Sequence, residues 1–171
     1  TDNLTSVDTI NGGAGTDILK MTDASTVIDA DFTNITNLES ITQNTASHGM
    51  NLTLGSAASS AGLVTVTGGT GTNTVTVGSG YTGALTVALA AGTDTVNGSA
   101  QTSGSLTVTT AQDSITSADT ITGGSATDTL IITGGGTALA AGDLTNVTAF
   151  STISTSGNST FGITTNNNNV A

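Results

Sequence analysis

The sequence predicts an all-β fold in which short strands wind into a β-solenoid. Three observations carry this prediction: alternating Val- and Thr-rich segments at short, regular intervals, glycine-rich turns between them, and an internal repeat. Proline, cysteine and tryptophan are absent, and aromatic residues make up only 2% of the chain. The core must therefore consist of Val, Ile, Leu and Ala, of which the β-branched residues suit a pleated sheet.

Each expected strand shows alternation of apolar and polar residues with a period of two. In Val64-Thr65-Val66-Thr67, for example, the valines face one side of the strand and the threonines the other. Gly, Asn, Asp and Ser occupy the intervals, as turns between strands require. The expected strands are 64–67, 75–77, 85–87, 106–109 and 130–133. No comparable segment has strong helical periodicity.

A glycine-rich motif occurs three times at nearly even spacing, as Gly12–Asp17, Gly68–Asn73 and Gly123–Asp128. The first and third copies also agree in their flanking segments. Asp8-Thr9-Ile10 corresponds to Asp119-Thr120-Ile121, and further on 31–36 corresponds to 143–148 after a slip of a single position. We therefore expect residues 1–171 to form a single repeat-built segment of a longer chain, with repeats that start near residues 8, 64 and 119.

Even spacing, glycine turns and an internal repeat favour a parallel solenoid of the β-roll or β-helix type. In such a fold, stacked coils align Val, Ile and Leu into ladders. A β-sandwich is the alternative, because it also uses short alternating strands.

The charge of the chain restricts its partners. Twelve acidic residues and one basic residue give a net charge of −11, which opposes binding to nucleic acid or to an anionic membrane. No segment is apolar enough for membrane insertion. Eleven of the twelve acidic residues are Asp, which is common in calcium-binding loops, so we expect divalent cations to neutralise them.

Catalysis is not expected, and we predict that the protein is not an enzyme. His48 is the only histidine, and without cysteine or a second histidine it cannot complete a zinc site. A hydrolase triad would depend on the same histidine, and no Gly-x-Ser-x-Gly elbow surrounds a candidate nucleophile.

The first glycine motif resembles a known calcium-binding repeat. Residues 12–20, Gly-Gly-Ala-Gly-Thr-Asp-Ile-Leu-Lys, match the nonapeptide G-G-x-G-x-D-x-U-x of the RTX (repeats-in-toxin) β-roll. In that family calcium lies between consecutive turns, and glycine carbonyls and aspartates bind it. Aspartates nine residues apart resemble the ends of successive nonapeptides. By this resemblance the calcium ligands are Asp8, Gly13, Gly15, Asp17, Asp94, Asp119, Gly124 and Asp128.

The other copies depart from the RTX motif. Asn73 replaces aspartate in the second copy, and Ala126 replaces a glycine in the third. We expect Asn73, which offers a neutral oxygen, to bind calcium weakly or not at all. Its replacement by alanine should then have little effect.

The wider pattern resembles the threonine-rich repeats of RTX-type bacterial surface-layer (S-layer) proteins and large secreted adhesins. It combines glycine-aspartate turns with Thr-Asn-Ile-Thr at 33–36 and Thr-Asn-Val-Thr at 145–148. The resemblance implies an extracellular, Ca²⁺-stabilised structural protein of the cell surface. It would self-associate into a lattice or filament, with cell-surface polysaccharide as a further candidate partner. The alternatives are the stalk or binding segment of an adhesin, and the RTX secretion module of an exported enzyme.

Overall fold

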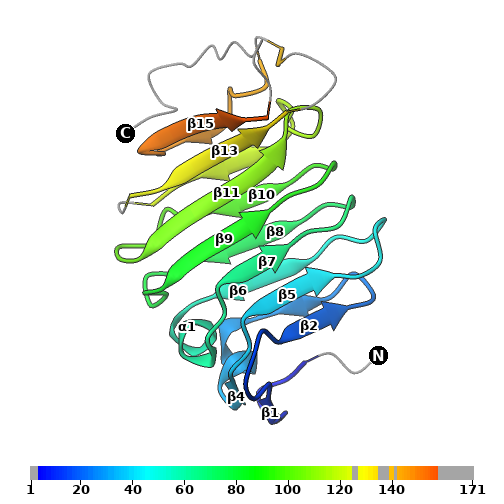
Figure 1. Cartoon of the computed structure of the whole chain (residues 1–171), viewed down its shortest axis with the longest axis vertical. Helices are drawn as coiled ribbons and strands as arrows, with labels where there is room; N and C mark the ends of the chain where they lie inside the picture. Colours follow the sequence, from blue (N-terminus) through cyan, green and yellow to red (C-terminus); the bar gives the residue numbers. More distant parts are fainter. Residues whose placement is uncertain (1–3, 125–126, 135–138, 141, 158–171) are drawn as a thin grey trace.

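The chain winds into a parallel β-solenoid of about 6 turns, which confirms the predicted fold class. The structure is a computed structural model that describes residues 4–124, 127–134, 139–140 and 142–157. The coils stack along the long axis, with the N-terminal coils at one end (Figure 1). All strand pairings among the described residues are parallel, as a solenoid requires and a β-sandwich does not.

Two long sheets run the length of the stack. The seven-stranded sheet contains β2 (Ile18–Met21), β5 (Ser40–Gln43), β7 (Thr65–Thr67), β9 (Ala84–Ala88), β11 (Ser105–Ala111), β13 (Thr129–Thr133) and β15 (Thr152–Ser156), in that spatial order. The six-stranded sheet contains β3 (Thr26–Val27), β6 (Asn51–Leu54), β8 (Thr74–Val77), β10 (Thr95–Asn97), β12 (Thr120–Thr122) and β14 (Val147–Thr148). The chain alternates between these two sheets from β5 onward, apart from the short helix described next.

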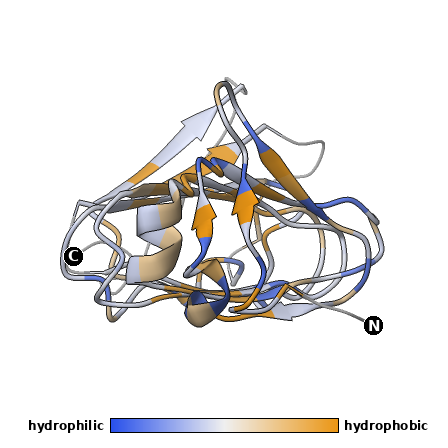
Figure 2. Cartoon of the chain, turned by 90° about the horizontal axis from the view of Figure 1, so that it is seen from below, coloured by the Kyte–Doolittle hydropathy of each residue, from blue (hydrophilic) through white to orange (hydrophobic). Residues whose placement is uncertain are grey.

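The N-terminal coils have a third side. There β1 (Ile10–Asn11) pairs with β4 (Ile35–Thr36). The next coil replaces the third strand by α1 (Ser56–Ala61), which contacts β4 and the 3-10 helix η1 (Asp29–Phe32). Figure 2 looks up the stack from this end and shows the coils as nested loops around a common interior.

Sequence periodicity missed α1 because the helix has only six residues. Its Ala-rich sequence favours a helix, and Gly62 ends it in the left-handed region at φ 100°. Asp29 of η1 stabilises its beginning from a neighbouring coil: Oδ1 accepts hydrogen bonds from Gly55 N at 2.7 Å and Ala58 N at 2.9 Å. In the part of the chain that the structure describes, no helix has the length and apolar character needed to cross a bilayer.

The core consists of apolar ladders, in which equivalent residues of successive coils stack in register. The ladder of the seven-stranded sheet is Leu19, Ile41, Val66, Val87, Val108, Leu130 and Ile153. The ladder of the six-stranded sheet is Val27, Leu52, Val75, Val96, Ile121 and Val147. Each fully buried side chain of this kind contributes about 1.5–3 kcal/mol. A slip of one residue would bury threonine instead, so the alternation fixes the register.

The coil is the structural unit behind the sequence repeat. In the ladder of the seven-stranded sheet, Leu130 lies five coils after Leu19, and these two residues follow the third and the first glycine motif. The interval from one glycine motif to the next therefore corresponds to two and a half coils. As a result, Gly12–Asp17 and Gly123–Asp128 lead into the seven-stranded sheet, whereas Gly68–Asn73 leads into the six-stranded sheet.

The first and third copies also repeat the same hydrogen bonds between coils. Asn34 Nδ2 donates to Ser6 O at 2.8 Å, and Asn146 Nδ2 donates to Ser117 O at 2.9 Å. Both asparagines belong to the Thr-Asn-Ile/Val-Thr segments. The sequence repeat is thus reproduced at the level of individual contacts.

Candidate calcium-binding turns

The predicted ligands lie in turns at the corners of the coils, immediately before strands. Asp17 and Asp128 precede β2 and β13 of the seven-stranded sheet, and Asp94 and Asp119 precede β10 and β12 of the six-stranded sheet. Nine residues cover one side of a coil. Asp119 and Asp128 therefore lie at successive corners of one coil, with β12 between them, rather than one above the other.

Asn73, Asp94 and Asp119 form a column along one edge of the six-stranded sheet, and all three are buried. Asp94 Oδ1 accepts hydrogen bonds from Asn73 N at 2.9 Å and Asn73 Nδ2 at 2.8 Å. Asp119 Oδ1 accepts from Asp94 N at 2.7 Å. Each carboxylate thus satisfies the backbone N–H at the equivalent position of the preceding coil, which burial would otherwise leave unpaired.

The column affects the protonation of Asp94. Burial raises the pKa of Asp94 above its ordinary value, the hydrogen bonds from Asn73 lower it, and the charge of Asp119 raises it again, with a net upward shift. The ionised form of Asp94 is therefore the costly one, and a further donor or a cation beside it would favour ionisation.

Asp128 plays the same structural role in the seven-stranded sheet. Its Oδ1 accepts from Leu106 N of the preceding coil at 2.8 Å, and its Oδ2 accepts from Gly124 N. Glu39 does likewise in an N-terminal coil, where its Oε2 accepts from Asp17 N at 2.8 Å. Because both oxygens of Asp128 accept hydrogen bonds from backbone N–H groups, these contacts can hold the Asp128 carboxylate in place without a bound ion.

Asp17 differs from Asp128, because its Oδ2 is buried and has no hydrogen-bond partner. The turn before it contains Gly13 and Gly15, both at positive φ (95° and 121°) and both exposed. A carboxylate oxygen without a donor, which follows a turn that contains several glycine carbonyls, offers ligand types that suit calcium. Of the three copies, Gly12–Asp17 thus fits the ion best.

Backbone oxygens would have to complete any such site. Within the described ranges, no three His, Asp or Glu side chains lie close enough together to hold a metal ion. Asp8 is already engaged, since its Oδ2 accepts from Thr5 N and Thr5 Oγ1, both at 2.8 Å. Gly124 contributes its N–H to Asp128, as described above.

Among the residues that the structure describes, four aspartates form the same kind of turn, which was not predicted from the sequence. In each turn, the aspartate N donates to the carbonyl three residues earlier, and the aspartate Oδ2 accepts from the N–H of that same residue. The pairs are Thr5–Asp8, Ile28–Asp31, Thr116–Asp119 and Ala140–Asp143. The first position of these turns is Thr, Ile, Thr or Ala, so no residue type marks the turn in the sequence. The turn accounts for these four aspartates without any metal.

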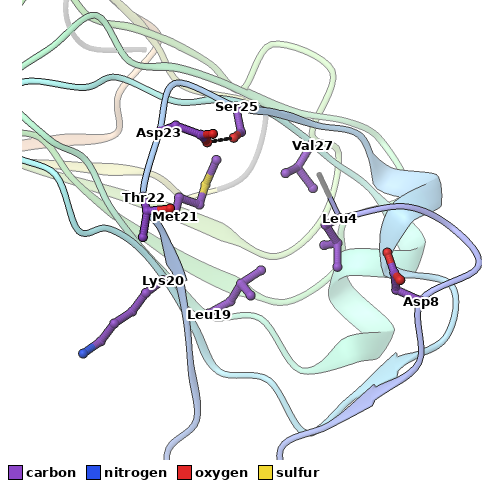
Figure 3. Close-up of a pocket in the computed structure, with 9 residues that line it drawn as sticks. All are labelled: Leu4, Asp8, Leu19, Lys20, Met21, Thr22, Asp23, Ser25 and Val27. Carbon is purple, nitrogen blue, oxygen red and sulfur yellow. Dashed lines mark hydrogen bonds between the residues drawn. The ribbon is translucent and has the colours of Figure 1, made fainter. Parts of the chain in front are cut away.

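A cavity of about 350 Å³ opens at the N-terminal end of the stack (Figure 3). Leu19, Met21 and Val27 border it, and Lys20 extends away from it. Its polar groups include Asp23, which hydrogen-bonds to Ser25. The apolar lining belongs to the strands of the first coil, so this cavity is the uncovered end of the core.

Replacing Asp128 by alanine tests the structural role of its carboxylate. In the presence of a chelator, Asp128→Ala should lower the free energy of unfolding by about 1–3 kcal/mol for each of the two donors left without an acceptor. Asp128→Asn retains one acceptor oxygen and should lose less. Urea unfolding measures both losses, and a chelator-treated Asp128→Ala protein as stable as the parent would show that the carboxylate is not structural.

Neither a protein-family model, nor a curated protein, nor a solved structure matches this chain. The fold, the charge and the geometry of the turns are therefore the features that bear on the function of the chain.

Proposed function

We propose that this chain is a calcium-stabilised, non-catalytic structural segment of a bacterial S-layer lattice outside the cell. The outward face of the seven-stranded sheet carries the proposal. Along it runs an in-register row of hydroxyl side chains, which begins at the buried Ser40 and continues through Thr65, Thr86, Thr107, Thr129 and Thr152. Apart from Lys20, the residues of this face are uncharged.

Such a face suits association between copies. A chain of net charge −11 repels another copy, but the carboxylates lie mostly in turns rather than on this face. Two copies can therefore approach through the sheet without bringing carboxylates together. The stacked coils would supply the stiffness that a surface lattice needs, and cell-surface polysaccharide is the candidate for attachment.

The acidity and the Gly12–Asp17 turn support calcium as the stabilising ion. The solenoid is compatible with RTX-type repeats, and Asp17 supplies a buried oxygen that lacks a donor. When bound, calcium would draw Asp17 and the glycine carbonyls together and offset the repulsion among the carboxylates.

Electron microscopy of the protein with added calcium tests the assembly. Two-dimensional sheets are the expected result, and a chelator should disperse them. Isolated fibres would instead favour the adhesin stalk. A protein that remains monomeric at saturating calcium would contradict a role in a lattice.

Calcium should also raise the melting temperature. Calcium at a hundred times its dissociation constant stabilises the folded state by about 2.7 kcal/mol, which corresponds to a shift of about 5–10 °C. Circular dichroism in chelator and in calcium measures the shift. Asp17→Ala should remove most of it, whereas Asp113→Ala, which removes a charge from an exposed residue outside these turns, should retain it. An identical melting curve in chelator and in calcium would contradict the proposal that calcium stabilises the fold.

A further inference from the structure

The amide of Asn73 makes an unusual set of contacts in the second glycine turn. Its Nδ2 lies 2.9 Å from Gly69 O, 2.9 Å from Gly71 O and 2.8 Å from Asp94 Oδ1. Two of these oxygens are carbonyls of its own turn, and the third is a carboxylate of the next coil. Asn73 is fully buried, with 0% of its surface exposed.

Three oxygens that converge on one atom form an arrangement typical of a cation site. Glycine carbonyls and an aspartate carboxylate are also the ligand types that calcium prefers. The amide group offers two N–H donors and carries no net charge. The three acceptors fix its orientation, because the opposite orientation would place Asn73 Oδ1 against all of them.

The side chain at the last position of the glycine motif is therefore satisfied differently in each of the three copies. Asp128 accepts backbone N–H groups from Leu106 and Gly124, and Asp17 keeps one buried oxygen without a donor. In the second copy the amide nitrogen itself lies among the oxygens, and Asn73 Oδ1, which is neutral, is buried without a donor as Asp17 Oδ2 is. We infer that the Asn73 amide takes the place of a bound cation, so that the second glycine turn closes without calcium.

This inference rests on the proposed calcium-stabilised scaffold and limits where calcium acts. The first turn would require the ion, whereas the coils around β8 and β10 would hold together in its absence. The inference also changes the expectation for Asn73. Its replacement by alanine should be damaging, because Asp94 and two glycine carbonyls would lose a shared donor.

Asn73→Asp is the direct test. It replaces the amide by a carboxylate that faces three oxygens, and a divalent cation would relieve that repulsion. In chelator the variant should melt below the parent. Added calcium should raise its melting temperature by about 5 °C more than it raises that of the parent, and calorimetric titration should detect one additional calcium ion per chain.

Two variants provide matched controls. Asn73→Ala should lose stability but gain no calcium ion. Asn97→Asp adds the same charge on an exposed residue of β10, where Asn97 Oδ1 already accepts from Ser99 N at 3.0 Å, and it should also gain no ion.

The outcomes separate this inference from the proposed function. Binding of no additional calcium by Asn73→Asp, or full stability of Asn73→Ala, would overturn the inference. A variant that is unfolded in chelator and refolds in calcium would support it, and one that stays unfolded at saturating calcium would contradict it. A parent protein that binds no calcium would refute calcium at the first turn, whereas an additional ion in Asn73→Asp would still support the role of the amide.

Hydrogen exchange of the parent protein gives an independent test. On addition of chelator, amides of β2 should lose protection, and amides of β8 and β10 should keep it. Equal loss in all three strands would contradict the assignment of a calcium-independent second turn.

Discussion

Ile132→Ala is expected to lower the free energy of unfolding by about 2–5 kcal/mol. Ile132 lies on the inward face of β13 and is fully buried in the core. Its truncation removes apolar contacts and leaves a cavity that the stacked coils cannot easily close, because hydrogen bonds on both sides of β13 hold the strand in place.

The neighbouring residue provides the control. Ile131 has the same side chain in the same strand, but it faces outward and is only partly buried. Ile131→Ala should therefore cost about 1 kcal/mol or less. Urea unfolding of both variants measures the difference. Equal losses would mean that the register of β13 is wrong, since a slip of one residue would exchange the two positions.

Gly104→Ala should have a comparably large effect. Gly104 has φ 81°, and a Cβ atom there would lie 2.1 Å from Gly83 O and 2.9 Å from Thr82 O. Backbone strain at positive φ costs about 1–3 kcal/mol, and overpacking against a neighbouring coil adds about 1–3 kcal/mol. The turn at Gly104 and the preceding coil at Thr82 and Gly83 would have to move apart.

Gly13→Ala separates these two contributions. Gly13 also has positive φ, at 95°, but a Cβ atom there would meet nothing within 4 Å. With a chelator present to remove any effect of calcium, this variant should show the strain alone. Thermal unfolding compares the two variants, and a loss at Gly13 as large as that at Gly104 would contradict a close approach of coils at Gly104.

The strands of the middle coils could be predicted because alternation is strongest there. The expected strand 106–109 lies within β11 (Ser105–Ala111), and the expected strand 130–133 lies within β13 (Thr129–Thr133). Three of the N-terminal strands, β1, β3 and β4, escaped prediction because they have only two residues each, too few for a period of two to appear. The coil length was not evident either, since turns of different length change it from one coil to the next along the seven-stranded sheet.

The role of each aspartate could not be predicted from the sequence alone. A calcium ligand and an acceptor for backbone N–H groups both call for a carboxylate beside a glycine turn. The choice between them depends on which donors the adjacent coil presents, such as Leu106 N for Asp128 and Asn73 for Asp94. Those donors belong to another coil, at a separation along the chain that varies from coil to coil.

The stacking of strands along the long axis also determines how the protein responds to tension (Figure 1). A force that pulls the two ends of the stack apart acts along the hydrogen bonds between coils, so it opens them one after another rather than shearing them together. Each coil that detaches releases about 70–90 Å of extended chain. Under load the molecule therefore lengthens in coil-sized steps and dissipates mechanical work before its ends are torn free.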